Sequence, residues 1–137
     1  MRDGFKAVVL GTVLTVGLTF GAAAQDAEIE AIINSQFEAF KVDDFAEAFQ
    51  YATPDLQRLF QSPQNFERMV MQGYPMVWRP GEVRYLELSE KDGAMWQKVQ
   101  VTDSKGATHY LGYRMEQTAA GWRIGGVQIL QAPDASV

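Results

Sequence analysis

The stretch Ile29–Phe40, IEAIINSQFEAF, decides the fold that we expect for this chain. Its apolar residues recur at the i, i+3, i+4, i+7 spacing that brings them to one face of a helix. A helix with one apolar face must bury that face against another layer of structure. The rest of the chain therefore has to supply the layer that covers this helix.

Shorter helices are predicted directly after it. Asp44 and Glu47 have the spacing of a capping box, which predicts a helix that begins at Phe45. Its expected inward residues are Phe45, Ala48, Phe49 and Ala52. Thr53-Pro54 and Ser62-Pro63 each place a capping hydroxyl before a proline that suits a first helical turn. They predict two more helices, one through Leu56, Leu59 and Phe60, and one through Phe66, Met69 and Val70 that Gly73 ends.

The second half of the chain has the pattern of strands and tight turns. Turn signals at Asp92-Gly93, Lys105-Gly106 and Ala120-Gly121 separate runs with strand preference, which predicts successive hairpins. The strands are expected at about Val83 to Ser89, Met95 to Thr102, Thr108 to Gln117 and Trp122 to Gln131.

These strands are expected to bend. Apolar positions in the last strand switch parity across Gly125-Gly126, which a β-bulge explains. The first strand shows the same slip between Tyr85 and Leu86, and Gly112 offers a bend point in the third. The sequence thus predicts an α+β fold in which N-terminal helices pack in a curved, four-stranded antiparallel meander, a cone-like arrangement.

Residues 1–24 have the pattern of a signal peptide. Arg2 and Lys6 precede the apolar stretch 7–20, and Ala24 ends a run of small residues that a signal peptidase accepts. We expect cleavage after Ala24, one domain at residues 25–132, a tail at 133–137, and a periplasmic or secreted location. An uncleaved anchor is the alternative, because residues 7–24 just reach the lower length limit of a membrane span.

Composition excludes several classes of function. A chain of 137 residues suits a single domain, and the absence of Cys excludes disulfides and thiolate chemistry. The formal net charge is −5, and no run of Lys or Arg occurs. We therefore expect neither nucleic acid nor, after signal cleavage, a membrane as a partner.

Catalytic candidates are few. His109, the single histidine, shares a strand face with Leu111 and Tyr113 and is a candidate general base. The spacing of the residues assigns Asp44 to helix capping. No spacing of metal ligands occurs, and G-x-S-x-G, G-x-G-x-x-G and P-loop motifs are missing, so neither a metal nor a cofactor is expected.

Aromatic residues of the strands, and of the connection before them, are candidates for ligand binding or for an interface. Tyr and Trp combine apolar bulk with a polar tip, although ordinary core packing is the commoner role. We select Tyr74, Trp78, Trp96, Tyr110, Tyr113 and Arg114. Arg114 and Tyr110 share the face opposite Leu111, where they fit a sheet-to-sheet homodimer.

The chain also resembles a known superfamily. Four parts of the sequence resemble the nuclear-transport-factor-two-like (SnoaL-like) superfamily: the helix Ile29–Phe40, the segment 40–49, the break 52–55 and the strand series after it. More narrowly, the segments 66–70 and 73–75 resemble a bacterial family known as domain of unknown function 4864. The resemblance implies a conical pocket between bent sheet and first helices. Some members of the superfamily use inward-facing Asp, Tyr or His for proton transfer, and others only bind or dimerise. The resemblance implies Asp44 as the matching candidate acid, with helix capping as its other role.

We therefore expect an exported, non-enzymatic domain that binds a small apolar or amphipathic ligand or a protein partner. Two alternatives stay open at this point. One is a pocket enzyme of isomerase, dehydratase or hydrolase type that uses His109 with a carboxylate or a Tyr. The other is a structural accessory subunit.

Overall fold

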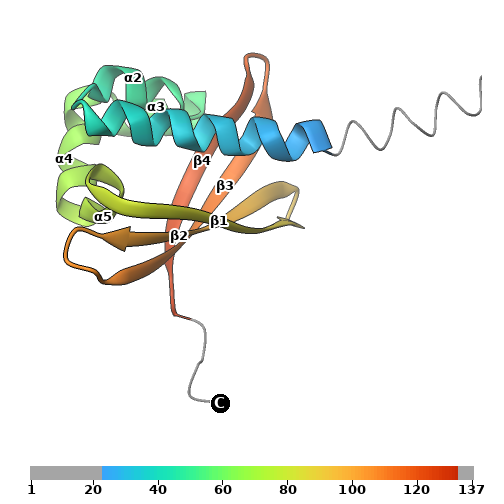
Figure 1. Ribbon diagram of the computed structural model, residues 1–137. Helices are drawn as coiled ribbons and strands as arrows, with labels where there is room; N and C mark the ends of the chain where they lie inside the picture. Colours follow the sequence, from blue (N-terminus) through green and yellow to red (C-terminus); the bar gives the residue numbers. More distant parts are fainter. Residues whose placement is uncertain (1–22, 133–137) are drawn as a thin grey trace, which may run out of the picture.

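A computed structural model describes residues 23–132 of the chain. The first helix, residues 23–41, is followed by further helices and then by strands (Figure 1). The helices are α2 (Phe45–Gln50), α3 (Pro54–Phe60), α4 (Pro63–Gly73) and α5 (Pro75–Trp78). The strands are β1 (Pro80–Lys91), β2 (Ala94–Asp103), β3 (Thr108–Thr118) and β4 (Gly121–Leu130). The predicted signal peptide up to residue 22 and the tail 133–137 lie outside the described residues.

The first helix buries the face that the sequence predicts. Ile29 and Ile33 are fully buried, and Phe37 and Phe40 retain at most 2% of their surface. Figure 1 shows this helix crossing the sheet, with α2, α3 and α4 gathered near its C-terminal end. The helix thus forms one wall of a hollow that the sheet and the short helices complete.

The predicted caps begin the next three helices. The Asp44 side chain accepts a hydrogen bond from the Glu47 backbone N–H at 3.1 Å. Thr53 and Ser62 cap α3 and α4 in the same way, each before its proline. The second half of a capping box is not formed, because the Glu47 carboxylate accepts from the Tyr51 hydroxyl at 2.6 Å. Because the backbone groups at these helix starts are satisfied locally, the short helices can begin at these residues.

The three apolar residues through which helix α3 was predicted differ in burial. Leu59 in α3 is 72% exposed, whereas its helix neighbours Leu56 and Phe60 are partly buried. The segment before α3 is tied to the sheet instead, since the Thr53 N–H donates to the Ile124 carbonyl at 2.9 Å. This tie to β4 fixes which side of α3 faces inward, and it leaves Leu59 on the outer side.

The strands form an antiparallel sheet in the order β1-β2-β3-β4, as predicted. Both predicted slips are present, since the pairing shifts between Tyr85 and Leu88 in β1 and opposite Gly125 in β4. The register across Gly112 is unbroken. The buried Gln97 amide donates to the Leu86 carbonyl at 2.9 Å and so satisfies the irregular backbone of the β1 bulge.

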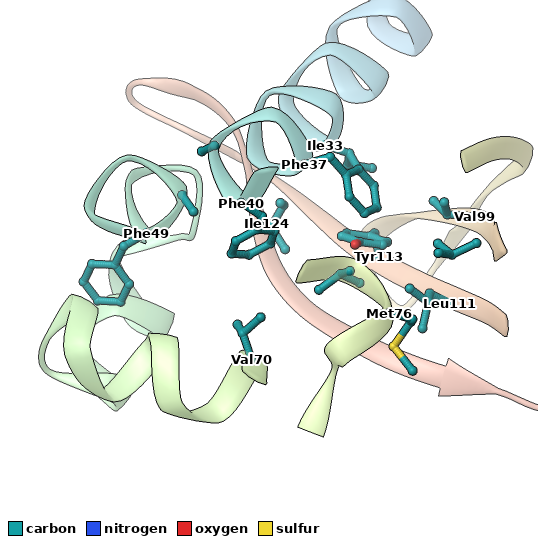
Figure 2. Close-up of a cluster of buried hydrophobic side chains, with 14 of the residues drawn as sticks. Ile33, Phe37, Phe40, Phe49, Val70, Met76, Val99, Leu111, Tyr113 and Ile124 are labelled. Carbon is teal, nitrogen blue, oxygen red and sulfur yellow. The ribbon is translucent and has the colours of Figure 1, made fainter. Parts of the chain in front are cut away.

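The core lies between the first helix and the inner face of the sheet. Figure 2 shows Tyr113 below Phe37, with Val99 and Leu111 on the neighbouring strand positions. Phe40, Phe49 and Phe66 extend the core into the layer of short helices, with ring centroids of neighbouring rings 5.4–6.0 Å apart. A pocket lies between these two parts of the core, lined by Phe66 on one side and Tyr113 on the other.

Candidate functional site

A cavity of about 330 Å³ lies between the short helices and strands β3 and β4. Ligand pockets in proteins begin at about this volume. Residues of the first helix, α3, α4, α5, β3, β4 and the α2–α3 connection line it: Gln36, Phe40, Ala52, Leu56, Phe60, Phe66, Met69, Val70, Tyr74, Val77, Tyr113, Ile124, Gly126 and Val127.

Burial distinguishes the floor of this pocket from its rim. Gln36, Val70, Tyr113 and Ile124 are among the lining residues that are buried. The lining residues that stay partly exposed are Leu56, Phe60, Met69, Tyr74, Gly126 and Val127. The pocket therefore opens to solvent between α3, α4 and β4, and it ends against the first helix and β3.

The wall carries no charge. None of the lining residues is Asp, Glu, His, Lys or Arg, and polar side chains come from Gln36, Tyr74 and Tyr113. The Gln36 amide nitrogen donates to the Ala48 carbonyl at 3.1 Å, and the Tyr74 hydroxyl donates to the Val127 carbonyl at 3.0 Å. Both donors are thus used to hold the wall together.

Tyr113 is different, because no hydrogen bond joins its hydroxyl to another residue in 23–132 and none contributes to its pKa. Burial raises the pKa of Tyr113, and the nearby Tyr85 and Tyr74 add to this effect. The phenol therefore stays protonated at physiological pH. Among the described residues the Trp96 indole nitrogen alone is a fully buried side-chain polar atom without a partner, so the Tyr113 hydroxyl keeps surface toward the pocket that it lines. It is a free donor there, from which a ligand oxygen can accept a hydrogen bond.

The family described as Domain of unknown function (DUF4864) matches residues 22–137. The chain belongs to this family. The match covers all of the described fold, pocket and sheet included. No curated protein matches the chain.

In this DUF4864 domain the six selected aromatic and arginine residues occupy three separate places. Tyr74 and Tyr113 line the pocket. Trp78 lies against the end of the first helix, where its indole N–H donates to Asp43 at 2.9 Å and its ring lies 4.3 Å below the Arg79 guanidinium. Arg79 also pairs with Asp43 at 2.9 Å, so this cluster fastens α5 to the turn after the first helix.

Trp96, Tyr110 and Arg114 lie on the outer face of the sheet. Trp96 and Arg114 are direct partners across β2 and β3. Arg114 donates to the Gly125 carbonyl at 2.9 Å and pairs with Glu116 at 3.1 Å, so it is held over the β4 bulge. The Trp96 indole nitrogen is buried without a hydrogen-bond partner among the described residues. Homodimerisation through this face stays a prediction, which light scattering of the purified chain tests.

The two catalytic candidates lie away from the pocket. His109 Nε2 is 2.8 Å from the Asp103 carboxylate, beside a separate hollow that Trp78, Arg79 and Lys105 also line. The Asp103 carboxylate accepts from the Lys105 and Ala107 N–H groups as well, so the pair closes the β2–β3 turn. Asp44 caps α2 and is exposed.

Across residues 23–132, no group of three or more His, Cys, Asp or Glu is placed to hold a metal ion. Within the same residues, none of the helices has the length and apolar character that crossing a membrane requires.

Sequence reasoning missed most of the pocket wall. Leu56, Phe60 and Met69 were predicted only as members of short helices, and nothing in their spacing distinguishes a pocket wall from a filled core. The rim residue Val127 is apolar and next to the Gly125-Gly126 bend. That bend was the one available signal, since a bulge redirects side chains at the edge of a hollow.

Proposed function

We propose that this chain is an exported, non-enzymatic domain that binds a small apolar or amphipathic molecule in the pocket lined by Tyr74 and Tyr113. The observation that carries the proposal is the uncharged cavity of about 330 Å³ with the unpaired Tyr113 hydroxyl on its floor. The pocket opens to solvent, reaches the volume at which ligand pockets begin, and has a mainly apolar wall, which together suit an apolar ligand.

The character of the wall favours binding over catalysis. General acid–base chemistry near neutral pH needs a group that titrates there and that touches the substrate. The pocket offers Tyr74 and Tyr113, and the pKa of Tyr113 is raised further from neutrality by burial. His109 and Asp103 lie at a different hollow and hold a turn. An enzyme that uses His109 is therefore the less supported alternative.

The superfamily placement is part of the same proposal. Helices followed by a curved antiparallel sheet, with a hollow between the layers, support placing this DUF4864 domain in the nuclear-transport-factor-two-like superfamily. The fold alone does not assign an activity, because one fold carries many unrelated functions.

Export is proposed from the sequence of residues 1–24. Expression of the full chain in a Gram-negative host should give a periplasmic product whose N-terminus is Gln25. An Ala24→Leu variant should keep the signal uncleaved, whereas the neighbouring Asp26→Asn change should leave cleavage intact. A cytosolic product with residues 1–24 retained would contradict export.

The binding function is tested with a variant that fills the pocket. Val70 is 3% exposed and lines the cavity, so Val70→Phe should occupy the space that a ligand needs. The matched control is Val42→Phe, because Val42 is 74% exposed and is not part of the wall. Binding of an environment-sensitive apolar dye, such as a naphthalene sulfonate, should be seen with wild type and Val42→Phe and lost with Val70→Phe.

Thermal unfolding and circular dichroism verify that both variants are folded. Stabilisation by a saturating ligand gives a second readout, because a ligand that binds the native state raises the midpoint. Equal dye binding by all three proteins would show that the dye binds elsewhere. That outcome, or no binding by wild type, would contradict the proposed function.

A further inference from the structure

The chemistry of the pocket floor also restricts what can bind there. On the proposed function, the ligand enters between α3, α4 and β4 and reaches the first helix and β3 with its buried end. The buried lining residues are apolar except for Gln36 and Tyr113. These two side chains decide which group the buried end of the ligand must carry.

Tyr113 supplies a hydrogen-bond donor. Its residue surface is 1% exposed, and no residue in 23–132 accepts from its hydroxyl. The raised pKa of Tyr113, which burial causes, keeps the proton in place. A ligand oxygen that accepts a hydrogen bond from this hydroxyl gains a favourable contact inside the pocket.

Gln36 supplies an acceptor. Its amide nitrogen is bound to the Ala48 carbonyl, which fixes the orientation of the amide. Its side-chain oxygen receives no hydrogen bond from any residue in the described part of the chain. The Gln36 oxygen is thus a free acceptor in the wall to which a ligand hydroxyl can donate, whereas a ketone can use only the Tyr113 donor.

A charged end does not fit. No Lys, Arg or His side chain lines the pocket, so a carboxylate at the floor would be buried without a counter-charge. Removing such an ion from water costs several kcal/mol unless a partner compensates. The rim around the mouth, with Leu56, Met69 and Val127, is equally apolar and suits a hydrocarbon tail.

We propose that the pocket selects uncharged, mainly aliphatic molecules that carry a carbonyl or hydroxyl oxygen at their buried end, over the corresponding hydrocarbons and carboxylates. The wall favours neither a rigid ring system nor a flexible chain, so the proposed selectivity concerns the polarity and charge of the ligand. The probes are decane, methyl octyl ketone, decanol and decanoate, which share their carbon count and differ at one end.

The experiment is displacement of the apolar dye by these four probes, with wild type and two tyrosine variants. In wild type the ketone and decanol should bind about three- to tenfold more tightly than decane, as one added hydrogen bond gives. Decanoate should bind more weakly than decane. Tyr113→Phe should remove the preference for the ketone and leave decane within about twofold.

Tyr74→Phe is the matched control, because the Tyr74 hydroxyl is already bound to the Val127 carbonyl. This variant should keep the preference for the ketone. The outcomes separate the two proposals. If all probes displace the dye equally and Tyr113→Phe changes nothing, or if decanoate binds best, the selectivity proposal is wrong while the pocket stands. If no probe displaces the dye and Val70→Phe has no effect, both proposals fail.

Discussion

The ring centroids of Tyr113 in β3 and Phe37 in the first helix lie 6.2 Å apart, with 55° between the ring planes. Tilted contacts of this kind are favourable for aromatic pairs. The contact joins the helix to the sheet (Figure 2), and Tyr113 is 1% exposed, so the ring has little freedom to move. The Tyr113 hydroxyl is consequently held on the pocket floor by packing, without the help of a hydrogen bond.

Tyr113→Phe should therefore leave the folded protein as stable as wild type or more stable, by up to about 1 kcal/mol. The change keeps the ring against Phe37 and removes a hydroxyl that has no partner in the described residues. Tyr113→Ala is the contrasting variant, which should lose about 3–5 kcal/mol through the cavity it creates. Urea denaturation measures both changes. A loss above about 1 kcal/mol for Tyr113→Phe would mean that the hydroxyl is paired in solution.

A pair of valines tests whether the pocket is open space. Val70 lines the cavity, whereas Val99 is fully buried in the core and does not line it. An added methyl group in empty space gains about 0.8 kcal/mol, whereas added volume in a close-packed core costs about 1–3 kcal/mol. Val70→Ile should thus raise the free energy of unfolding, and Val99→Ile should lower it.

The same denaturation experiment decides the outcome. Equal destabilisation by Val70→Ile and Val99→Ile would show that the wall closes on itself in solution. Saturation with a bound ligand should reverse the sign for Val70→Ile, since the added methyl group then competes with the ligand.

Local patterns account for the parts of the fold that the sequence could predict. The stripe from Ile29 to Phe40, the hydroxyl caps at Thr53 and Ser62 and the turn glycines each act over a few residues. The bulge at Gly125 was also predictable, because a parity switch in one strand reveals it. Each of these signals is present in the sequence without knowledge of what packs nearby.

The pocket depends on contacts that no local pattern contains. Tyr74 reaches the Val127 carbonyl from a position far away in the chain, and Thr53 pairs with Ile124 across the fold. Strand parity correctly assigned Tyr113 to one face and Arg114 to the other. The alternation of side chains along β3 does not reveal that a pocket lies over Tyr113. Helix α5 was missed as well, since a helix of this length shows no periodicity.

The Asp103 carboxylate should make stability depend on acid pH. Its hydrogen bond with His109, together with those from the Ala107 and Lys105 N–H groups, lowers the pKa of Asp103. A carboxyl group whose pKa is lower in the folded state stabilises the fold above its unfolded pKa of about 3.9. That contribution is lost as the pH falls through the folded pKa.

Asp103→Asn keeps the shape of the side chain and removes its charge. The variant should be less stable than wild type at neutral pH, and the difference should shrink as the pH falls below about 4. His109→Gln should raise the Asp103 pKa toward its ordinary value, which NMR titration of the carboxyl carbon measures. An unchanged pH dependence in Asp103→Asn would show that this carboxylate adds nothing to stability.

Two glycines give a last prediction with opposite signs. A Cβ at Gly73, at the end of α4, would meet nothing within 4 Å. A Cβ at Gly125 would come within 2.9 Å of the Glu116 carboxyl carbon and 3.4 Å of Arg114 Nε. Gly73→Ala should raise the free energy of unfolding by about 0.4–1 kcal/mol, because alanine restricts the unfolded chain. Gly125→Ala should lower it by about 1 kcal/mol, since Glu116 must move away and leave the partly exposed Arg114 without its ion pair.

Glu116→Ala provides the control for the second effect. If the added methyl group acts through this carboxylate, Gly125→Ala should be less destabilising in a Glu116→Ala background than in wild type. Additive losses in the double-mutant cycle would locate the cost in the backbone of the bulge instead. The bulge sets the direction of the rim residue Val127. If Gly125→Ala distorts the backbone of the bulge, it should therefore weaken ligand binding more than if it only displaces the Glu116 carboxylate.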